Sequence, residues 1–432
     1  MKKFSLALLL IILTAGIFLR VYGIGASFGF EGELGRELLY LRTNYLAGKL
    51  PLIGLTTSHE WLSYGPFYYW FMLPIFAAFR GNPFILYWSA LIVSAFGLIL
   101  NYFVVKRITD EKIALVSTLL EAISPLLIWQ TKLSKLHVFF FVLTPVLMYL
   151  FYLVWNGNKK WVFWLGLVFG LMFSFHFSQI PLLGVTVLLF WMKKNLYKPI
   201  DWLKFATGVI VPNITLLWQD KSILLWLPYR ALNPLDKNFS GTFSSLSEFL
   251  GRLLFWDQKI WFLGVFIFLL ILGHYIWSNR SKLRHEFLPF YLISSVGLIL
   301  AANVLHGGVP VHYFLPIFTI VPILYAIYLV KVKWGFLILI LLAILNFQGY
   351  FDSRITGGFV DYSKQIEAAN FIVFDARSIP FSIKRIGLFD YFPENYSQNY
   401  KYLVLWKGGN LVENSPNVYK IVEDNGNVEV EK

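Results

Sequence analysis

Residues 2–20 have the sequence KKFSLALLLIILTAGIFLR, in which two lysines precede a long apolar run that ends at Arg20. A run of this length is typical of a membrane-spanning helix, which needs about 20 residues. A cleaved secretory signal also begins with basic residues, but its apolar part is shorter. Because many similar apolar blocks follow, we expect this block to be a retained anchor with the N-terminus in the cytoplasm.

The rest of the chain repeats this pattern of apolar blocks between short basic segments. Of its 432 residues, 57% are hydrophobic, 19% aromatic and only 14% charged, and the mean hydropathy is +0.63. Soluble domains carry about 25% charged residues, so these values exclude a soluble globular protein. The blocks also lack the apolar–polar alternation of an outer-membrane barrel. The predicted fold class is an all-α polytopic membrane protein.

The net charge of +13 comes from the apolar part of the chain. Residues 1–351 hold 28 basic and 13 acidic residues, whereas residues 352–432 hold 9 and 11. The basic residues form short clusters between apolar blocks, as positive-inside orientation requires, so we expect a lipid bilayer and no nucleic acid as partner. The chain has no cysteine, which excludes disulfides, cysteine-ligated zinc and thiol catalysis.

Placing these basic clusters in the cytoplasm predicts about eleven transmembrane helices in residues 1–351. They lie near 4–22, 84–105, 113–129, 138–155, 161–175, 178–192, 202–218, 260–277, 288–304, 313–330 and 335–350. The two helices on either side of His176 are short, but merging them would place one lysine pair on the wrong side.

Three stretches on the outer face are too long for simple turns. The first, residues 23–83, holds a helical pattern at 32–48 and an apolar run at 66–79 that we expect to lie on the membrane surface. The second is residues 219–259. The third, residues 352–432, loses the apolar blocks and contains β-rich runs at 402–406 and 418–422, which predict a small α/β domain on the outer face.

Candidate catalytic residues lie just after the first span. Residues 28–38, FGFEGELGREL, bring together Glu31, Glu33 and Glu37, followed by LAGKLPLIG at 46–54 and YGPFYYW at 64–70. Acidic residues at a helix end are often only solvated, so the acidic cluster by itself leaves a structural role open.

With its first span ending in Leu-Arg, this series of motifs resembles the GT-C glycosyltransferases that use polyprenyl-phosphate sugars, such as protein O-mannosyltransferases and lipid A aminoarabinose transferases. The motifs SPLLIW at 124–129, FHFSQ at 175–179 and VHYFLP at 311–316 agree with it. The resemblance covers about residues 1–350 and is strongest in residues 15–80. It implies an enzyme of the plasma (inner) membrane that transfers a sugar from a polyprenyl-phosphate donor to a lipid, glycan or protein acceptor on the extracytoplasmic face.

The resemblance also implies an essential acidic residue in the first outer loop. Glu33 matches it, because Gly32 precedes Glu33 and Glu37 follows four residues later. The family usually has aspartate there, so Glu31 remains an alternative. Such a carboxylate takes the proton from the attacking hydroxyl in a single displacement that inverts the anomeric centre.

Cations are needed to stabilise the phosphate leaving group. The loop TKLSKLH supplies Lys132, Lys135 and His137. We expect Lys132 to contact the phosphate because the family often has an arginine nearby, whereas Lys135 is equally well explained as an anchor at the membrane interface. Further candidates for substrate binding are Arg20, His176, Asp220, Lys221, His312 and Tyr313.

No cofactor is required by these residues. The family's second acidic residue is missing from the loop around Lys132, so a divalent metal has no support from the sequence. Two other functions remain open: a transporter or flippase for a lipid-linked sugar, and an O-antigen ligase or polymerase. Transporters often have internal repeats and polar groups at the bilayer midplane, whereas here the polar candidates gather at one surface, which favours the enzyme.

Overall fold

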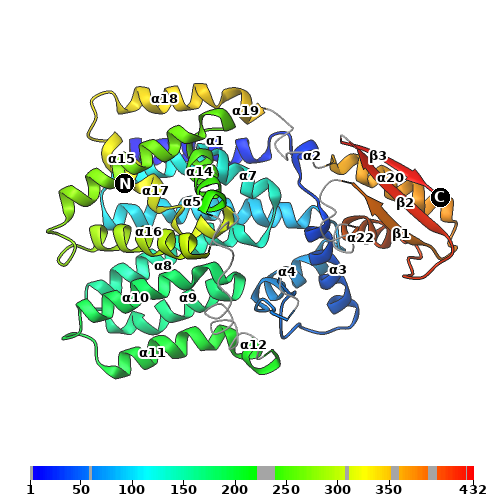
Figure 1. Cartoon of the computed structure of the whole chain (residues 1–432), viewed down its shortest axis with the longest axis horizontal. Coiled ribbons are helices and arrows are strands. Elements are labelled where there is room, and N and C mark those ends of the chain that lie inside the picture. Colours follow the sequence, from blue (N-terminus) through cyan, green and yellow to red (C-terminus); the bar gives the residue numbers. More distant parts are fainter. Residues whose placement is uncertain are drawn as a thin grey trace.

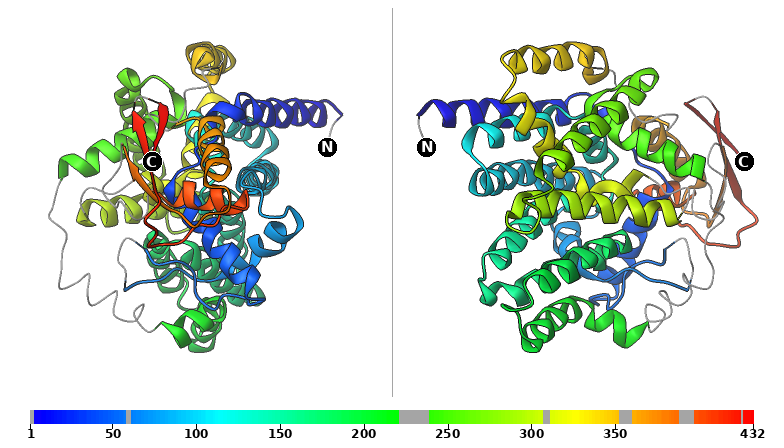
Figure 2. Two further views of the ribbon diagram at one scale, coloured as in Figure 1. Left: turned by 90° about the vertical axis from the view of Figure 1, so that its right-hand side faces the viewer. Right: turned by 60° about the vertical axis from the view of Figure 1, so that its left-hand side comes forward.

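Helices form most of the chain up to residue 351, and a small sheet lies at one end of the molecule (Figure 1). The structure is a computed structural model that describes residues 3–57, 61–220, 239–306, 311–351, 360–387, 397–424 and 426–432. Most of the helices run along the long axis of the molecule (Figure 1). Figure 2 shows the C-terminal sheet outside the helical bundle, at the end opposite the N-terminus.

The predicted helices all find counterparts in the structure. In the first half these are α1 (Lys3–Val21), α2 (Ile24–Ser27), α3 (Gly32–Leu46), α4 (Phe67–Ala78), α5 (Ile85–Ile108), α6 (Glu111–Ile123), α7 (Pro125–Leu133), the short 3-10 helix η1 (Leu136–Phe139), α8 (Phe140–Trp155), η2 (Lys159–Trp161), α9 (Val162–Phe175), η3 (Phe177–Gln179), α10 (Ile180–Met192), α11 (Pro199–Ile210), η4 (Val211–Asn213) and α12 (Ile214–Gln219). They continue with α14 (Phe239–Leu254), η5 (Gln258–Ile260), α15 (Trp261–Asn279), α16 (Phe287–His306), η6 (Val311–Ile317), α17 (Ile320–Leu329), α18 (Gly335–Leu345) and α19 (Phe347–Phe351).

Not all of these helices are long enough to cross a bilayer unaided. Among the described residues, five are long and apolar enough, and two bent pairs bring the number to seven. Four more apolar helices are shorter, among them α4 and α18. The chain is therefore a multi-pass membrane protein, and the number of eleven crossings stays a prediction.

The helix predicted at 113–129 is not continuous. It is divided into α6 and α7, which meet at an angle of 53°. Pro125 has no N–H to donate and disfavours a helical residue before it, so the helix stops there. In an apolar surrounding the carbonyls freed by such a break need new donors. Arg20 donates to the carbonyls of Glu121 (3.2 Å) and Ala122 (2.9 Å), and Tyr350 donates to that of Ile123 (2.6 Å).

The C-terminal part has two helices and a three-stranded sheet. Strand β1 (Ser382–Ile386) pairs in parallel with β2 (Val418–Asp424), which pairs antiparallel with β3 (Asn427–Glu431). The registers place Ser382 opposite Val418, and Lys420 opposite Glu431. The strand predicted at 418–422 is confirmed.

The strand predicted at 402–406 is wrong, because this segment lies in helix α22 (Gln398–Trp406). A short, continuous apolar run suits a buried strand or a buried helix equally well. Tyr402, Leu403 and Val404 are all buried, and α22 packs between α3 and the second helix of this part, α20 (Tyr362–Ala376). Packing therefore selects the helix.

The C-terminal part packs directly against the first outer loop. The side chain of Gln365 on α20 donates to the carbonyl of Phe30 (2.8 Å) and accepts from the amide of Asn399 on α22 (2.8 Å). The ring of Tyr362 lies 5.3 Å from that of Phe28 and 4.8 Å from that of Phe84. This contact fixes α20 and α22 to the segment that leads into α3, which carries two of the three acidic candidates.

Candidate active site

Two acidic candidates share one lysine. Helix α3 begins at Gly32, so the extended residue Glu31 stands at its cap and Glu33 lies in its first turn. After α7, Ser134 adopts a left-handed conformation (φ 58°) that ends the helix and brings Lys135 over α3. The Lys135 Nζ lies 2.5 Å from a Glu31 oxygen and 2.6 Å from a Glu33 oxygen.

The two carboxylates differ in their surroundings. The Glu33 side chain is 57% exposed and that of Glu31 only 10%. Lys135 holds the pKa of Glu33 below its usual value, whereas burial raises the pKa of Glu31 despite the same lysine. The two carboxylates in turn raise the pKa of Lys135, even though burial opposes this. Glu33 is therefore the accessible carboxylate that is ionised at neutral pH.

Glu37 lies one helical turn after Glu33 and is buried. Burial raises its pKa to about 7, partly offset by the Tyr69 hydroxyl and Arg36. This carboxyl is thus about half protonated at neutral pH, which suits it less than Glu33 to take up a proton.

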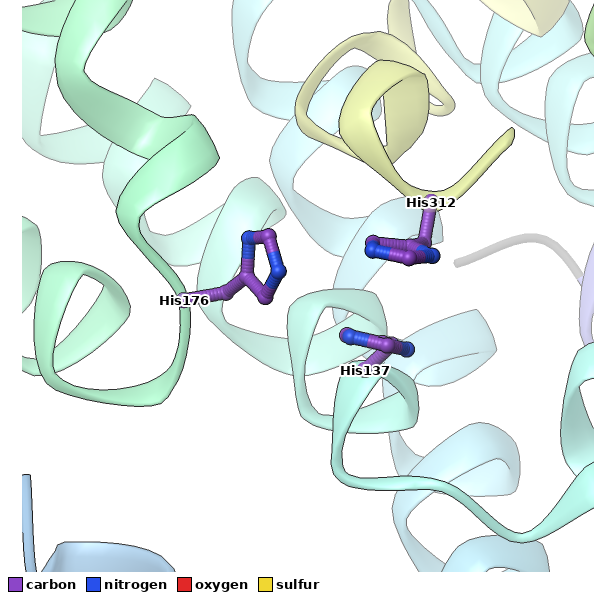
Figure 3. A group of neighbouring side chains, drawn as sticks. All are labelled: His137, His176 and His312. Carbon is purple, nitrogen blue, oxygen red and sulfur yellow. The ribbon is translucent and has the colours of Figure 1, made fainter. Parts of the chain in front are cut away.

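Three histidines from distant parts of the chain meet beside these residues (Figure 3). His137 lies on η1, His176 between α9 and η3, and His312 on η6. The rings of His137 and His312 are stacked with their centroids 4.2 Å apart, and that of His176 stands edge-on to both at 5.2 and 4.9 Å. One ring nitrogen from each lies within 4.8 Å of the others. This group is able to hold a metal ion.

A cavity of about 270 Å³ joins the acidic and histidine groups. Seven of the predicted site residues line it: Glu33, Glu37, Lys135, His137, His176, His312 and Tyr313. Glu31 adjoins it through Lys135. The cavity thus combines an ionised carboxylate, a lysine and imidazoles in a space large enough for part of a sugar phosphate.

Sequence reasoning missed three residues of the cavity wall, namely Arg36, Thr57 and Tyr64. Arg36 comes three residues after Glu33, so the helical period of α3 was the available signal. Tyr64 begins the YGPFYYW motif. Its ring lies 5.7 Å from that of His176, and the next residue, Gly65, donates its backbone N–H to the Ser174 carbonyl (2.9 Å).

Other predicted site residues lie away from the cavity. Arg20 is fully buried and holds Ser94 (2.8 Å) as well as the broken end of α6. Lys132 is also fully buried, and its Nζ donates to the Tyr22 carbonyl (2.8 Å). Asp220 ends α12 and does not line the cavity. Lys221 lies outside the described residues. The lysine beside Glu33 is therefore Lys135, not Lys132.

Residues 63–218 match the family model of dolichyl-phosphate-mannose-protein mannosyltransferases. Two solved structures are similar to the chain. ArnT from Cupriavidus metallidurans bound to undecaprenyl phosphate gives a TM-score of 0.59 at 12% identity, over 94% of this chain and 76% of that chain. The oligosaccharyltransferase AglB from Archaeoglobus fulgidus, in complex with an inhibitory peptide and a dolichol-phosphate, gives 0.57 at 11% identity, over 96% of this chain and 64% of that chain.

A comparison with curated protein sequences gave no match. The structural similarities at low identity show a shared fold. This chain has the fold of the GT-C glycosyltransferases, the group that the motifs of the first outer loop resemble.

Proposed function

We propose that this protein transfers a sugar from a polyprenyl-phosphate-linked donor, such as an undecaprenyl or dolichyl phosphate sugar, to a hydroxyl group of a lipid, glycan or protein acceptor. The observation that carries this proposal is the exposed, ionised Glu33 on the cavity wall, paired with Lys135 at 2.6 Å. The polyprenyl phosphates bound by ArnT and AglB, which share the fold, support a lipid-phosphate donor.

The transfer is a single displacement at the anomeric carbon. The acceptor oxygen forms a bond to this carbon as its proton moves to the Glu33 carboxylate, which acts as general base. The bond between the carbon and the phosphate oxygen breaks, and the polyprenyl phosphate leaves with the electron pair. Since attack and departure take place on opposite faces, the configuration at the anomeric carbon is inverted.

Lys135 has two functions in this scheme. It keeps Glu33 ionised, because its positive charge opposes protonation of the carboxylate. It also supplies positive charge to the cavity, together with Arg36, where negative charge develops on the leaving phosphate. Glu31 holds Lys135 from its buried side. We place this reaction on the extracytoplasmic face, where the first outer loop is predicted to lie.

The test is transfer of radiolabelled sugar from a panel of polyprenyl-phosphate donors by the full-length protein in proteoliposomes. Glu33→Gln removes the base at nearly constant size, so we expect transfer to be abolished while donor binding persists. Glu31→Gln is the matched control and should be milder. If both variants keep more than about a tenth of the wild-type rate, less than about 1.4 kcal/mol of the barrier is at stake, and neither glutamate is the base. Movement of intact donor across the bilayer, without release of polyprenyl phosphate, would instead identify a flippase.

A further inference from the structure

We propose that His137, His176 and His312 form a binding site for a divalent transition-metal ion such as Zn²⁺, with one coordination position open to the cavity. The three side chains come from three separate elements and point towards one another (Figure 3). Their nearest ring nitrogens lie within 4.8 Å of one another.

The ring nitrogens of two of these histidines lack protein partners. His137 is 9% exposed, and within the described part of the chain no protein group is hydrogen-bonded to a ring nitrogen of His137 or His312. Buried polar atoms normally have a partner, so these nitrogens need a ligand. The stacked arrangement at 4.2 Å also disfavours two charged rings, and a neutral imidazole is the form that binds metal.

The third histidine already has the support that a metal ligand requires. The Nδ1 of His176 lies 2.9 Å from the Ser178 hydroxyl oxygen, which also accepts from the side-chain amide of Gln179 (3.1 Å). A metal-binding histidine usually donates its second ring N–H to such an oxygen, which fixes the ring and its tautomer. With Nδ1–H donating to Ser178, Nε2 of His176 is free to bind the ion.

The site differs from a bound-metal geometry by small side-chain movements. Two nitrogens bound to one tetrahedral zinc ion, each at about 2.1 Å, are roughly 3.4 Å apart. The rings must therefore close by roughly 1 Å from their separations here, which rotation of the three side chains provides. Three neutral imidazoles favour zinc, cobalt or copper over magnesium and calcium, which prefer oxygen ligands.

Three histidines leave the fourth position of a tetrahedral ion open, as in catalytic rather than structural zinc sites. The same cavity wall carries Glu33 and Lys135. Lys135 is already paired with two carboxylates, so a bound dication adds positive charge where the donor phosphate leaves. This role, a phosphate oxygen as the fourth ligand, rests on the proposed transferase function, whereas the metal site does not.

The site is tested by metal binding to the full-length protein in detergent, without a polyhistidine tag and after treatment with a chelator. We expect one Co²⁺ per chain, seen as visible absorption bands of a low-coordinate ion, and displacement of the cobalt by Zn²⁺. His176→Ala and His312→Gln should each lower the affinity at least about tenfold, and Ser178→Ala by about tenfold. His274→Ala is the control. His274 is exposed, bonds the Tyr328 hydroxyl (2.6 Å) and lines a separate cavity, so its loss should leave the affinity unchanged.

Two results would overturn the site: less than one Co²⁺ per wild-type chain, or equal affinity in the wild-type protein and both histidine variants. Zinc should also raise the unfolding temperature of the wild-type protein and not that of the histidine variants, which shows that the variants are folded. Glu33→Gln should bind the metal normally, so that failure of the transferase proposal leaves this test intact. If chelation leaves transfer unchanged in protein that binds the ion, the phosphate role is rejected.

Discussion

At the scale of residues, the candidate site depends on how one lysine is shared by two carboxylates. Glu31 and Glu33 contact the same Lys135 Nζ at nearly equal distances, 2.5 and 2.6 Å. Burial of Glu31 raises its pKa, whereas the more exposed Glu33 has its pKa lowered by the lysine. The cavity thus has an ionised base at neutral pH, although two acidic groups lie side by side.

Replacing this lysine should change the pH dependence of transfer. Glu33 accepts a proton only when ionised, so activity falls as the pH drops through its pKa, which Lys135 holds below the usual value. In Lys135→Met the burial and the charge of Glu31 remain without the lysine, so the pKa of Glu33 rises. The acid limb of the pH–rate profile should move to higher pH. Lys132→Met is the control, because Lys132 does not line the cavity; an acid limb at the same pH in Lys135→Met and the wild-type enzyme would contradict this assignment.

Glu37 should make the protein less stable as the pH rises. Its pKa is about 7 in the folded protein, raised by burial from 4.5. The folded state therefore holds a proton that the unfolded state has lost, so this contribution is complete below pH 4.5 and is lost as the pH rises through 7. The loss is on the order of 3 kcal/mol. Glu37→Gln should gain in unfolding temperature over the wild-type protein between pH 4 and pH 8.

The control for this experiment is a glutamate with the opposite shift. Lys135 lowers the pKa of Glu33, so the ionised form stabilises the folded state above the usual pKa, and Glu33→Gln should lose stability over the same pH range. Thermal unfolding in detergent at both pH values distinguishes the two signs. A Glu37→Gln variant that parallels the wild-type protein at both pH values would show that this carboxyl is not buried in its charged form.

At the scale of elements, α3 is held in place from two sides. Its first turn contacts Lys135, and its middle packs against α22, where Gly35 meets the backbone of Asn399. A Cβ at Gly35 would lie 2.2 Å from the Asn399 nitrogen, closer than any packing allows. The C-terminal part therefore sets the position of the helix that carries Glu33 and Glu37.

Gly35→Ala should separate these two helices. The added methyl group meets backbone atoms, which cannot rotate away, so we expect about 1–3 kcal/mol of destabilisation and a several-fold loss of transfer as Glu33 shifts. The measurements are unfolding temperature, transfer rate and protease cleavage between α19 and α20. Gly273→Ala on α15 is the control, because a Cβ there meets nothing within 4 Å. Equal transfer rates in the two variants would show that α22 does not position α3.

At the scale of the whole molecule, the predicted cytoplasmic turns gather at one end of the bundle. A cavity of about 830 Å³ is lined there by Thr109, Asn156, Asn279 and Lys331, from the turns after α5, α8, α15 and α17. The C-terminal sheet lies at the other end (Figure 2). The structure thus gives the bundle two distinct ends, in agreement with the charge clusters, and the side of the membrane that each faces stays a prediction.

Cysteine labelling tests this orientation, because the chain contains no cysteine of its own. Single cysteines at Asn156 and Asn279 should be shielded from an impermeant thiol reagent in intact cells, and one at the exposed Asn410 of the C-terminal part should react. Permeabilised cells provide the control, since all three positions should then be labelled. Labelling of position 156 in intact cells would reverse or rearrange the predicted topology.

The sequence by itself determined the class of protein and the general place of the site. Apolar blocks such as residues 4–22 reveal membrane helices, because burial in lipid requires about 20 apolar residues whatever the neighbouring helices are. The helix at 32–48 and the acidic residues Glu31, Glu33 and Glu37 also follow from local pattern and motif. These features depend on residues close together in the chain.

Only the tertiary structure decided which cation serves the site and which partners surround it. Lys132 and Lys135 are three residues apart, and the bend at Pro125 with the left-handed Ser134 sends one to Tyr22 and the other to Glu33. The grouping of His137, His176 and His312 arises from elements up to 175 residues apart, and the helix at 402–406 arises from packing against α3. Such outcomes depend on contacts between distant segments, whose competing energies do not show in a local pattern.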